Sequence, residues 1–374
     1  MPSKVLLKKD WKQVSLLWIL LVFLGIVAFT VPVWTDMYAY EQQILEIKQN
    51  PSDFPDIVTG DVNEMVPEDF FGDGSGYGYL GGLNGLIPSG GVIFLFVIFG
   101  ALMASVLIGS ERNSQMSDFT MSLPYTRTQL YISKWVLGAT GIVTSTLIGG
   151  TLMFLIIRFS DYSFLMEGKE FKVTAMILFL MLSGISFFSL SLWMGSFGGE
   201  SISQVIWTFV ALVFPMGILL LVQGSLYAFF PDRLFSFFDE AFESIPMRIL
   251  SPLNNIFNVD MYSVYTDQSV WNDFITYAPI LAVANIALTF GLGLWMFKEA
   301  PQENNGRFFM FSSWLWLIHI VIVICFAMLG GVMFSVISYP QNMILYVLGF
   351  VIGAFLAHLL AKRLLYRFNL KLKS

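Results

Sequence analysis

Hydrophobic and polar positions along the chain fall into long blocks, and the apolar blocks are long enough to be membrane spans. A helix needs ~20 apolar residues to cross a bilayer. Eight runs of about this length are expected to be spans: 14–33, 91–108, 135–157, 173–195, 205–222, 274–297, 314–334 and 344–361. The pattern therefore predicts an all-α polytopic membrane protein, and an even number of spans places both termini on one side of the membrane.

A long polar interruption, residues 109–134, separates the second and third runs. Three apolar residues share one face of a short helix predicted inside it: Met116, Phe119 and Leu123. Pro124 ends that helix, and the spacing of Thr126 and Gln129 predicts a capping box that begins the next one. The pattern fits a docking surface, and it fits an ordinary connecting loop equally well.

The segments between the spans predict the remaining organisation of the chain. In residues 1–13, Leu7 and Trp11 lie on one helical face and four lysines lie beside them, which is typical of an interfacial helix on the inner leaflet. The expected divisions are an amphipathic cytoplasmic interfacial helix 1–13, a first span 14–34, an acidic and glycine-rich extracytoplasmic segment 35–90, four spans in 91–222, an extracytoplasmic amphipathic segment 223–273, three spans in 274–361 and a basic cytoplasmic tail 362–374.

Composition supports the membrane assignment, and charge predicts its orientation. The chain is 56% hydrophobic and only 12% charged. The N-terminus, the 109–134 loop, the loop after the sixth span and the tail together hold fourteen of the twenty Lys and Arg residues, so we expect them to face the cytoplasm. The opposite loops hold twenty of the 26 acidic residues, and the acidic sequence pI of about 5.0 therefore describes the outer loops.

Motifs for enzymatic, metal or nucleotide chemistry are missing from the sequence. The glycine-rich stretch 72–85 has no Gly-Lys-Ser/Thr after it, and Asp73 opens no complete calcium loop. The single cysteine, Cys325, excludes an intramolecular disulfide, and we expect no metal site. Because the chain contains no Walker A motif, uphill transport of a substrate would require another chain to hydrolyse ATP.

The 109–134 loop carries a family resemblance. A glutamate just inside the span (Glu111), a short amphipathic helix, the run Ser122-Leu123-Pro124-Tyr125-Thr126-Arg127 and a lysine at Lys134 resemble the type-2 ABC exporter permease pattern, in particular the longer permeases of Gram-positive bacteria. The resemblance implies a multi-pass subunit of the cell membrane, without its own ATPase site, that works as a homodimer or heterodimer with cytoplasmic ATP-binding cassette subunits. ATP and Mg would be bound by those partner subunits and no cofactor by this chain.

On this resemblance the loop would be a coupling helix that fits a groove on the ATPase. The residues expected to couple the two subunits are Glu111, Met116, Phe119, Leu123, Arg127 and Lys134. Arg127 is the strongest single candidate, because its guanidinium can hold a carboxylate across an interface, and the alternative role is a contact with a lipid phosphate at the inner leaflet. The expected substrate is an amphipathic or lipid-like molecule or a peptide antibiotic.

Small residues at four-residue spacing predict close helix packing in two spans, within the subunit or across a dimer. They are Gly141, Ser145 and Gly149 in the third span and Gly349, Gly353 and Ala357 in the last. Two features depart from the family pattern: members commonly have six spans, and the outer segment after the first span is unusually large.

Two other functions remain open at the level of the sequence. One is a membrane sensor or scaffold that transports nothing and signals inward through the 109–134 loop. The other is a proton-coupled transporter, which would need His319 or His358, both toward the inner halves of their spans. We expect contact with membrane lipid and no nucleic-acid partner.

Overall fold

The computed structural model describes residues 4–54, 65–70, 90–114, 116–230, 235–259, 263–264, 267–337 and 342–363. Within these ranges the chain is helical and contains no strand. The predicted glycine-rich stretch 72–85 and most of the predicted basic tail lie outside the described residues.

Eight helical segments among the described residues are long and apolar enough to cross a membrane, which confirms the predicted all-α polytopic class. They are α1 (Lys4–Gln49), α3 to α4 (Gly90–Asn113), α6 (Arg127–Arg158), α7 (Glu170–Phe197), α8 (Ser201–Tyr227), α13 (Gln268–Glu299), η6 with α14 (Ser312–Val336) and α15 (Met343–Ala361). The side of the membrane that each end faces stays a prediction.

Shorter helices connect these segments. A π-helical turn, η3 (Ser105–Gly109), joins α3 (Gly90–Ala104) to α4 (Ser110–Asn113). The others are η1 (Pro51–Asp53), η2 (Pro67–Phe70), α5 (Met116–Ser122), η4 (Ser163–Met166), α9 (Phe235–Glu243), α10 (Ile245–Leu250), α11 (Pro252–Phe257), η5 (Gln302–Asn304) and η6 (Ser312–Trp314), which leads into α14 (Leu315–Val336).

The first helix is continuous across several of the predicted divisions. α1 holds 46 residues and joins the predicted interfacial helix, the first span and the start of the outer segment without a break. At 1.5 Å per residue it is about 70 Å long, more than twice the ~30 Å hydrocarbon core of a bilayer, so it extends beyond the membrane. The location of residues 4–13 at the membrane surface stays a prediction.

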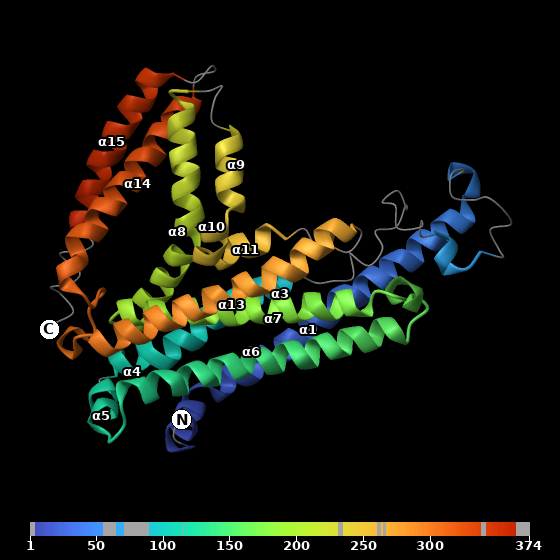
Figure 1. Ribbon diagram of the computed structural model, residues 1–374, viewed down its shortest axis with the longest axis horizontal. Coiled ribbons are helices and arrows are strands. Elements are labelled where there is room, and N and C mark those ends of the chain that lie inside the picture. The colour runs from blue at the N-terminus through green and yellow to red at the C-terminus, as the bar shows by residue number, and fades with distance from the viewer. Residues whose placement is uncertain are drawn as a thin grey trace.

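The main bundle consists of α1, α3, α6, α7 and α13 (Figure 1). Its helices approach closely where small side chains meet. The hydroxyl of Ser145 on α6 donates to the Leu21 carbonyl oxygen of α1 at 3.1 Å, and Gly141 and Gly149 on α6 face Trp18 and Phe29 of α1. The predicted small-residue row of the third span is therefore occupied by a contact inside this chain.

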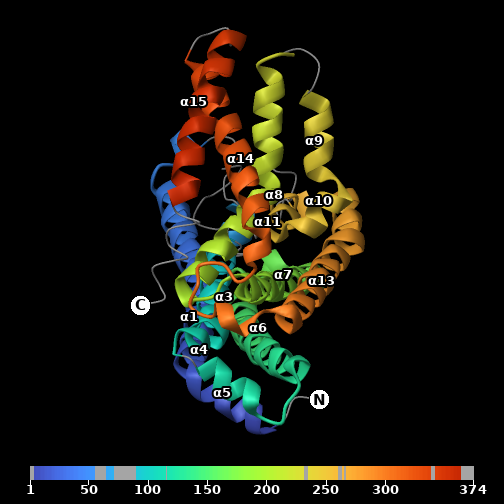
Figure 2. The same cartoon turned by 90° about the vertical axis from the view of Figure 1, so that its left-hand side faces the viewer.

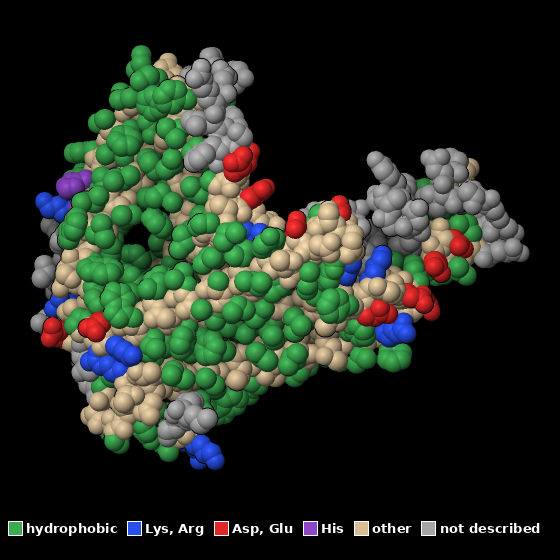
Figure 3. All heavy atoms as spheres, viewed as in Figure 1, with side chains coloured by type: hydrophobic (Ala, Val, Ile, Leu, Met, Phe, Trp, Pro, Cys, Tyr) green, Lys and Arg blue, Asp and Glu red, His purple; other side chains and the backbone are tan. Residues whose placement is uncertain are grey.

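A second group of helices, α14, α15 and the later half of α8, leaves the main bundle at a steep angle (Figures 1 and 2). α14 and α15 pack so closely that a Cβ atom added at Gly353 would lie 2.6 Å from the Phe326 carbonyl oxygen, and Gly349 faces Gly330 in the same way. Ala357 is buried on the same helix. Much of the surface of this group is apolar (Figure 3).

Candidate functional site

The chain between α3 and α6 forms a projecting end of the bundle (Figures 1 and 2). α5 ends at Ser122, and Thr126 then caps α6. The Thr126 hydroxyl accepts from the Gln129 backbone N–H at 3.3 Å, and the Gln129 side-chain oxygen accepts from the Thr126 backbone N–H at 3.0 Å. The predicted capping box is confirmed, and it sets the direction in which α6 leaves the loop.

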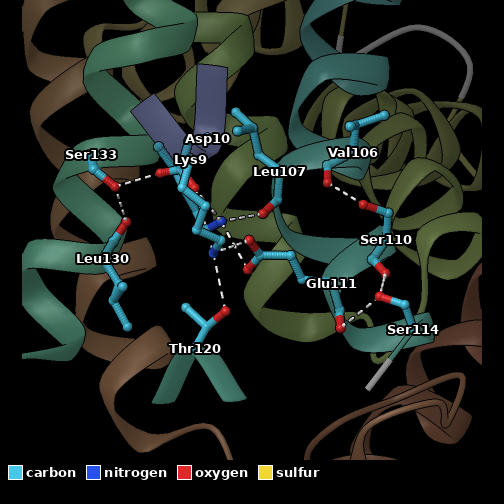
Figure 4. Close-up of polar contacts among 11 residues, drawn as sticks. Lys9, Asp10, Val106, Leu107, Ser110, Glu111, Ser114, Thr120, Leu130 and Ser133 are labelled. Carbon is cyan, nitrogen blue, oxygen red and sulfur yellow. Dashed lines mark hydrogen bonds and ion pairs between the residues drawn. The ribbon is translucent and has the colours of Figure 1, made fainter. Parts of the chain in front are cut away.

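Four charged side chains meet at the root of this loop, and we call Lys9, Asp10, Glu111 and Lys134 the charged quartet (Figure 4). The Glu111 carboxylate lies 2.9 Å from Lys134 Nζ and 2.6 Å from Lys9 Nζ. Asp10 lies 3.5 Å from Lys134 Nζ and 3.7 Å from Lys9 Nζ. Two cations and two carboxylates make the quartet neutral as a whole.

Three members of the charged quartet are removed from water, whereas the side chain of Lys9 is 25% exposed. Asp10 and Lys134 are each 1% exposed, and Glu111 is 5% exposed. Charges buried in this way are stable only when each is paired and its remaining hydrogen-bonding capacity is used. The structure meets that condition through neutral neighbours. Ser133 donates to Asp10 at 2.6 Å, Lys134 donates to the Leu107 carbonyl oxygen, and Lys9 donates to the Thr120 hydroxyl at 3.0 Å.

The members of the quartet come from three helices, so the quartet holds α1, α4 and α6 together at the base of the loop. Lys9 and Asp10 belong to α1, Glu111 to α4 and Lys134 to α6, and Thr120 of α5 is bound through Lys9. A displacement of α4 and α5 must therefore either break buried ion pairs or move α1 and α6 as well.

A second set of contacts ties the loop to α7 and α8. The buried Arg112 guanidinium donates to the carbonyl oxygens of Gly195 and Gly198, at the end of α7. Such carbonyls have no partner within their own helix, and a cation near them is favoured by the helix dipole. The Asn113 side chain accepts from the Ser201 backbone N–H at 3.3 Å, at the first residue of α8.

Arg127 lies at the start of α6 and contacts a different helix end. Its guanidinium donates to the backbone carbonyl oxygens of Lys298 and Ala300, where α13 ends, the second bond being 3.2 Å long. Within the described residues it therefore binds carbonyl groups of its own chain. The predicted contact with a partner's carboxylate stays a prediction.

Two apolar side chains of α5 are exposed on the outer surface of the loop. Met116 is 45% exposed and Phe119 is 65% exposed, whereas Leu123 is half-buried. Behind them, Thr120 is buried, and a small cavity of about 20 Å³ lies among Glu111, Arg112 and Lys134. A space of that size holds about one water molecule, so the interior of the loop is close-packed.

The structure brings together some of the residues singled out in the sequence and adds others. Glu111 and Lys134 form an ion pair, and Met116 and Phe119 share the exposed face of α5. The additional residues are Lys9, Asp10, Thr120 and Arg112. A weak signal for Asp10 exists, since it is the one acidic residue among the lysines of segment 1–13.

The two histidines also come together. His319 Nε2 lies 3.1 Å from His358 Nδ1, between α14 and α15 and away from the charged quartet. This geometry is an interhelical hydrogen bond. A role in proton movement stays a prediction.

The fold and this loop define a multi-pass helical membrane protein whose spans are joined by a charged, projecting connection. Comparison with known proteins identifies it further. Residues 5–335 match the family described as "ABC-2 family transporter protein", and the chain belongs to that family. It is the membrane subunit of an ABC transporter and a multi-pass protein of the cell membrane.

Two relatives come from Bacillus subtilis (strain 168). The "Probable ABC transporter permease YtrD" is 24% identical over 369 residues, which cover 98% of each chain. The "Probable ABC transporter permease YtrC" is 27% identical over 213 residues, which cover 57% of this chain and 61% of that relative. No solved structure matches the chain significantly.

Proposed function

We propose that the chain is an export permease that receives the energy of ATP hydrolysis through α5 from a separate ATP-binding cassette subunit. The family implies an ATPase of this kind as partner. The observation that supports α5 as the contact is the exposure of Met116 and Phe119 at a projecting end of the bundle. Exposed aromatic and methionine side chains are typical anchors of protein interfaces.

The contacts behind α5 support its role in transmission. A partner that closes on Met116 and Phe119 pushes on a loop whose base is held by buried ion pairs. The displacement of the loop is transmitted to α1 and α6 by the charged quartet, and to α7 by Arg112. Buried, well-packed contacts transmit displacement because they cannot deform freely.

The proposed substrate is an amphipathic or lipid-like molecule, including a peptide antibiotic. This substrate class is supported by the apolar surface of α8, α14 and α15, because such a molecule can move along that surface from the bilayer. We further propose that the permease works as a dimer, with itself or with a related permease, and that ATP and Mg are bound only by the ATPase subunits.

The experiment that tests this function is co-purification of the chain with an ATPase encoded beside its gene. We expect a stable complex whose ATP hydrolysis drives movement of an amphipathic substrate. Absence of any such ATPase gene, together with ligand binding that occurs without ATP-dependent transport, would instead support the sensor or scaffold.

A further inference from the structure

The segment between α8 and α13 reaches the middle of the membrane-spanning region. α9, α10 and α11 fold back between α8 and α13 (Figures 1 and 2). Asn285 of α13 donates from its side chain to the Ile249 carbonyl oxygen of α10 and accepts from the Ser186 hydroxyl of α7. Asn285 lies eleven residues from the start and twelve from the end of the apolar run 274–297. The end of α10 is therefore level with the midpoint of that span, about 17 Å from either end.

Buried side chains satisfy backbone groups of this re-entrant segment and tie it to α13. The Ser251 hydroxyl accepts from the Asn254 backbone N–H at 3.2 Å and caps α11. Asn254 donates to the Phe242 carbonyl oxygen at 2.6 Å, and Asn255 donates to the Ala278 carbonyl oxygen of α13 at 3.2 Å. Irregular backbone is tolerated at membrane depth only under such conditions.

This arrangement places an arginine at membrane depth. Arg248 precedes Ile249 on α10 and is half-buried, and its Nε donates to the Asn255 side-chain oxygen at 3.2 Å. Among the described residues its guanidinium forms no ion pair, and the charged group that acts on it is Glu243 of α9. Ionisable groups at this depth are rare and are typically functional.

The geometry of the guanidinium suits a ligand with two oxygens. Asn255 takes the Nε–H group, and the described residues provide no hydrogen-bond acceptor for the two terminal nitrogens. These nitrogens present parallel N–H groups, which match a phosphate or a carboxylate in a bidentate contact.

The surroundings of Arg248 are suited to an amphiphile. Ile245 and Leu250 on the same short helix are exposed. The surface is hollowed between the α8–α9 side and α13, where α10 lies (Figures 1 and 3). A cation beside exposed apolar side chains offers separate contacts to a charged headgroup and to its hydrocarbon chain, although α9, which packs on α10, also exposes the acidic residues Asp239, Glu240 and Glu243.

We propose that Arg248 binds the anionic headgroup, a phosphate or a carboxylate, of a membrane amphiphile. That this amphiphile is the transported substrate rests on the proposed function, whereas the binding itself does not. Glu243 is the carboxylate that competes with the headgroup for the guanidinium.

The test uses the full-length chain in nanodiscs of phosphatidylcholine with a minor fraction of phosphatidylglycerol. The phosphatidylglycerol retained by each chain after delipidation is measured by native mass spectrometry. Loss of a bidentate, charge-assisted contact in Arg248→Gln should weaken retention by about tenfold or more. Arg248→Lys should be intermediate, and Glu243→Gln should retain as much as the wild type or more.

The matched control is Arg158→Gln, the same change at an exposed arginine where α6 ends, and it should leave retention unchanged. Equal retention by Arg248→Gln and the wild type overturns the proposal. If Arg248→Gln does not fold, equal retention by Arg248→Lys together with reduced retention by Glu243→Gln overturns it.

Adding inorganic phosphate to the buffer distinguishes the two sources of the bound anion, a lipid headgroup and free phosphate. Unchanged retention supports a headgroup presented from the bilayer, whereas displacement of the lipid by free phosphate overturns the lipid assignment. The assay contains neither ATP nor an ATPase. Failure of the chain to bind an ATPase and failure of Arg248 to bind lipid are therefore separate results.

Discussion

Lys134 Nζ lies 2.9 Å from Glu111 Oε2, so the two ends of the polar loop are joined by a buried ion pair. The pair closes the base of α5, and Lys9 and Asp10 bring α1 to the same point. The loop is therefore a rigid projection with three helices attached to its root. On the proposed function, this closed base would carry a displacement of α5 to α1 and α6 together.

The first prediction concerns the balance of charge in the quartet. Lys134→Met leaves two buried carboxylates with one cation, and breaking a buried pair in this way costs about 3–5 kcal/mol of stability. Thermal unfolding in detergent should show a clear loss relative to Lys8→Met, which removes an exposed lysine from α1. The double variant Glu111→Gln/Lys134→Met should recover part of the loss, because it restores neutrality. An equal effect of Lys134→Met and Lys8→Met would contradict the buried quartet.

The second prediction concerns the contact between the loop and α7. Arg112→Lys keeps the charge but removes the planar group that reaches both the Gly195 and Gly198 carbonyl oxygens. One lost charge-assisted bond at a buried site should cost about 1.5–3 kcal/mol. Chemical denaturation measures this cost, with the exposed Arg158→Lys as control. Indistinguishable stability of the two variants would show that Arg112 does not hold the end of α7.

The third prediction concerns the contact between α14 and α15. Gly353→Ala introduces a methyl group against the backbone of α14 and should destabilise the protein by about 1–3 kcal/mol. Gly291→Ala on α13 meets no atom within 4 Å, so it should be neutral or slightly stabilising. Thermal unfolding of the two variants gives the comparison. Equal melting temperatures would argue against close packing of α14 on α15.

The spans and the loop could be predicted from the sequence because both depend on local pattern. Long apolar runs indicate the spans, and the Thr126–Gln129 spacing indicates the start of α6. The charged quartet depends instead on tertiary contact: Asp10 is 101 residues from Glu111 in the chain, and its neighbouring lysines are typical of a lipid-facing helix.

The same limit applies to membrane depth. Arg248 lies outside every apolar run, so the sequence assigns it to an outer loop. Its position level with the middle of α13 follows from one side-chain contact, between Asn285 and the Ile249 carbonyl oxygen. A pattern of hydrophobicity carries no information about such a return of the chain into the membrane.

The fourth prediction concerns Arg127. Arg127→Glu places a carboxylate beside the terminal carbonyl groups of α13, where negative charge is unfavourable. We expect reduced ATP-dependent transport by the reconstituted complex, with Arg127→Lys retaining most of the activity. Unchanged transport by Arg127→Glu would remove Arg127 from the coupling residues.

The central claim, that α5 receives the ATPase, is tested most directly by the affinity of the ATPase encoded beside this gene for the purified chain. The double variant Met116→Ser/Phe119→Ser removes two exposed apolar side chains without touching the charged quartet. Loss of interface anchors worth about 2 kcal/mol should weaken binding by about thirtyfold and leave the melting temperature unchanged. Phe159→Ser, an exposed phenylalanine where α6 ends, should bind like the wild type. Wild-type affinity of the double variant would contradict the claim.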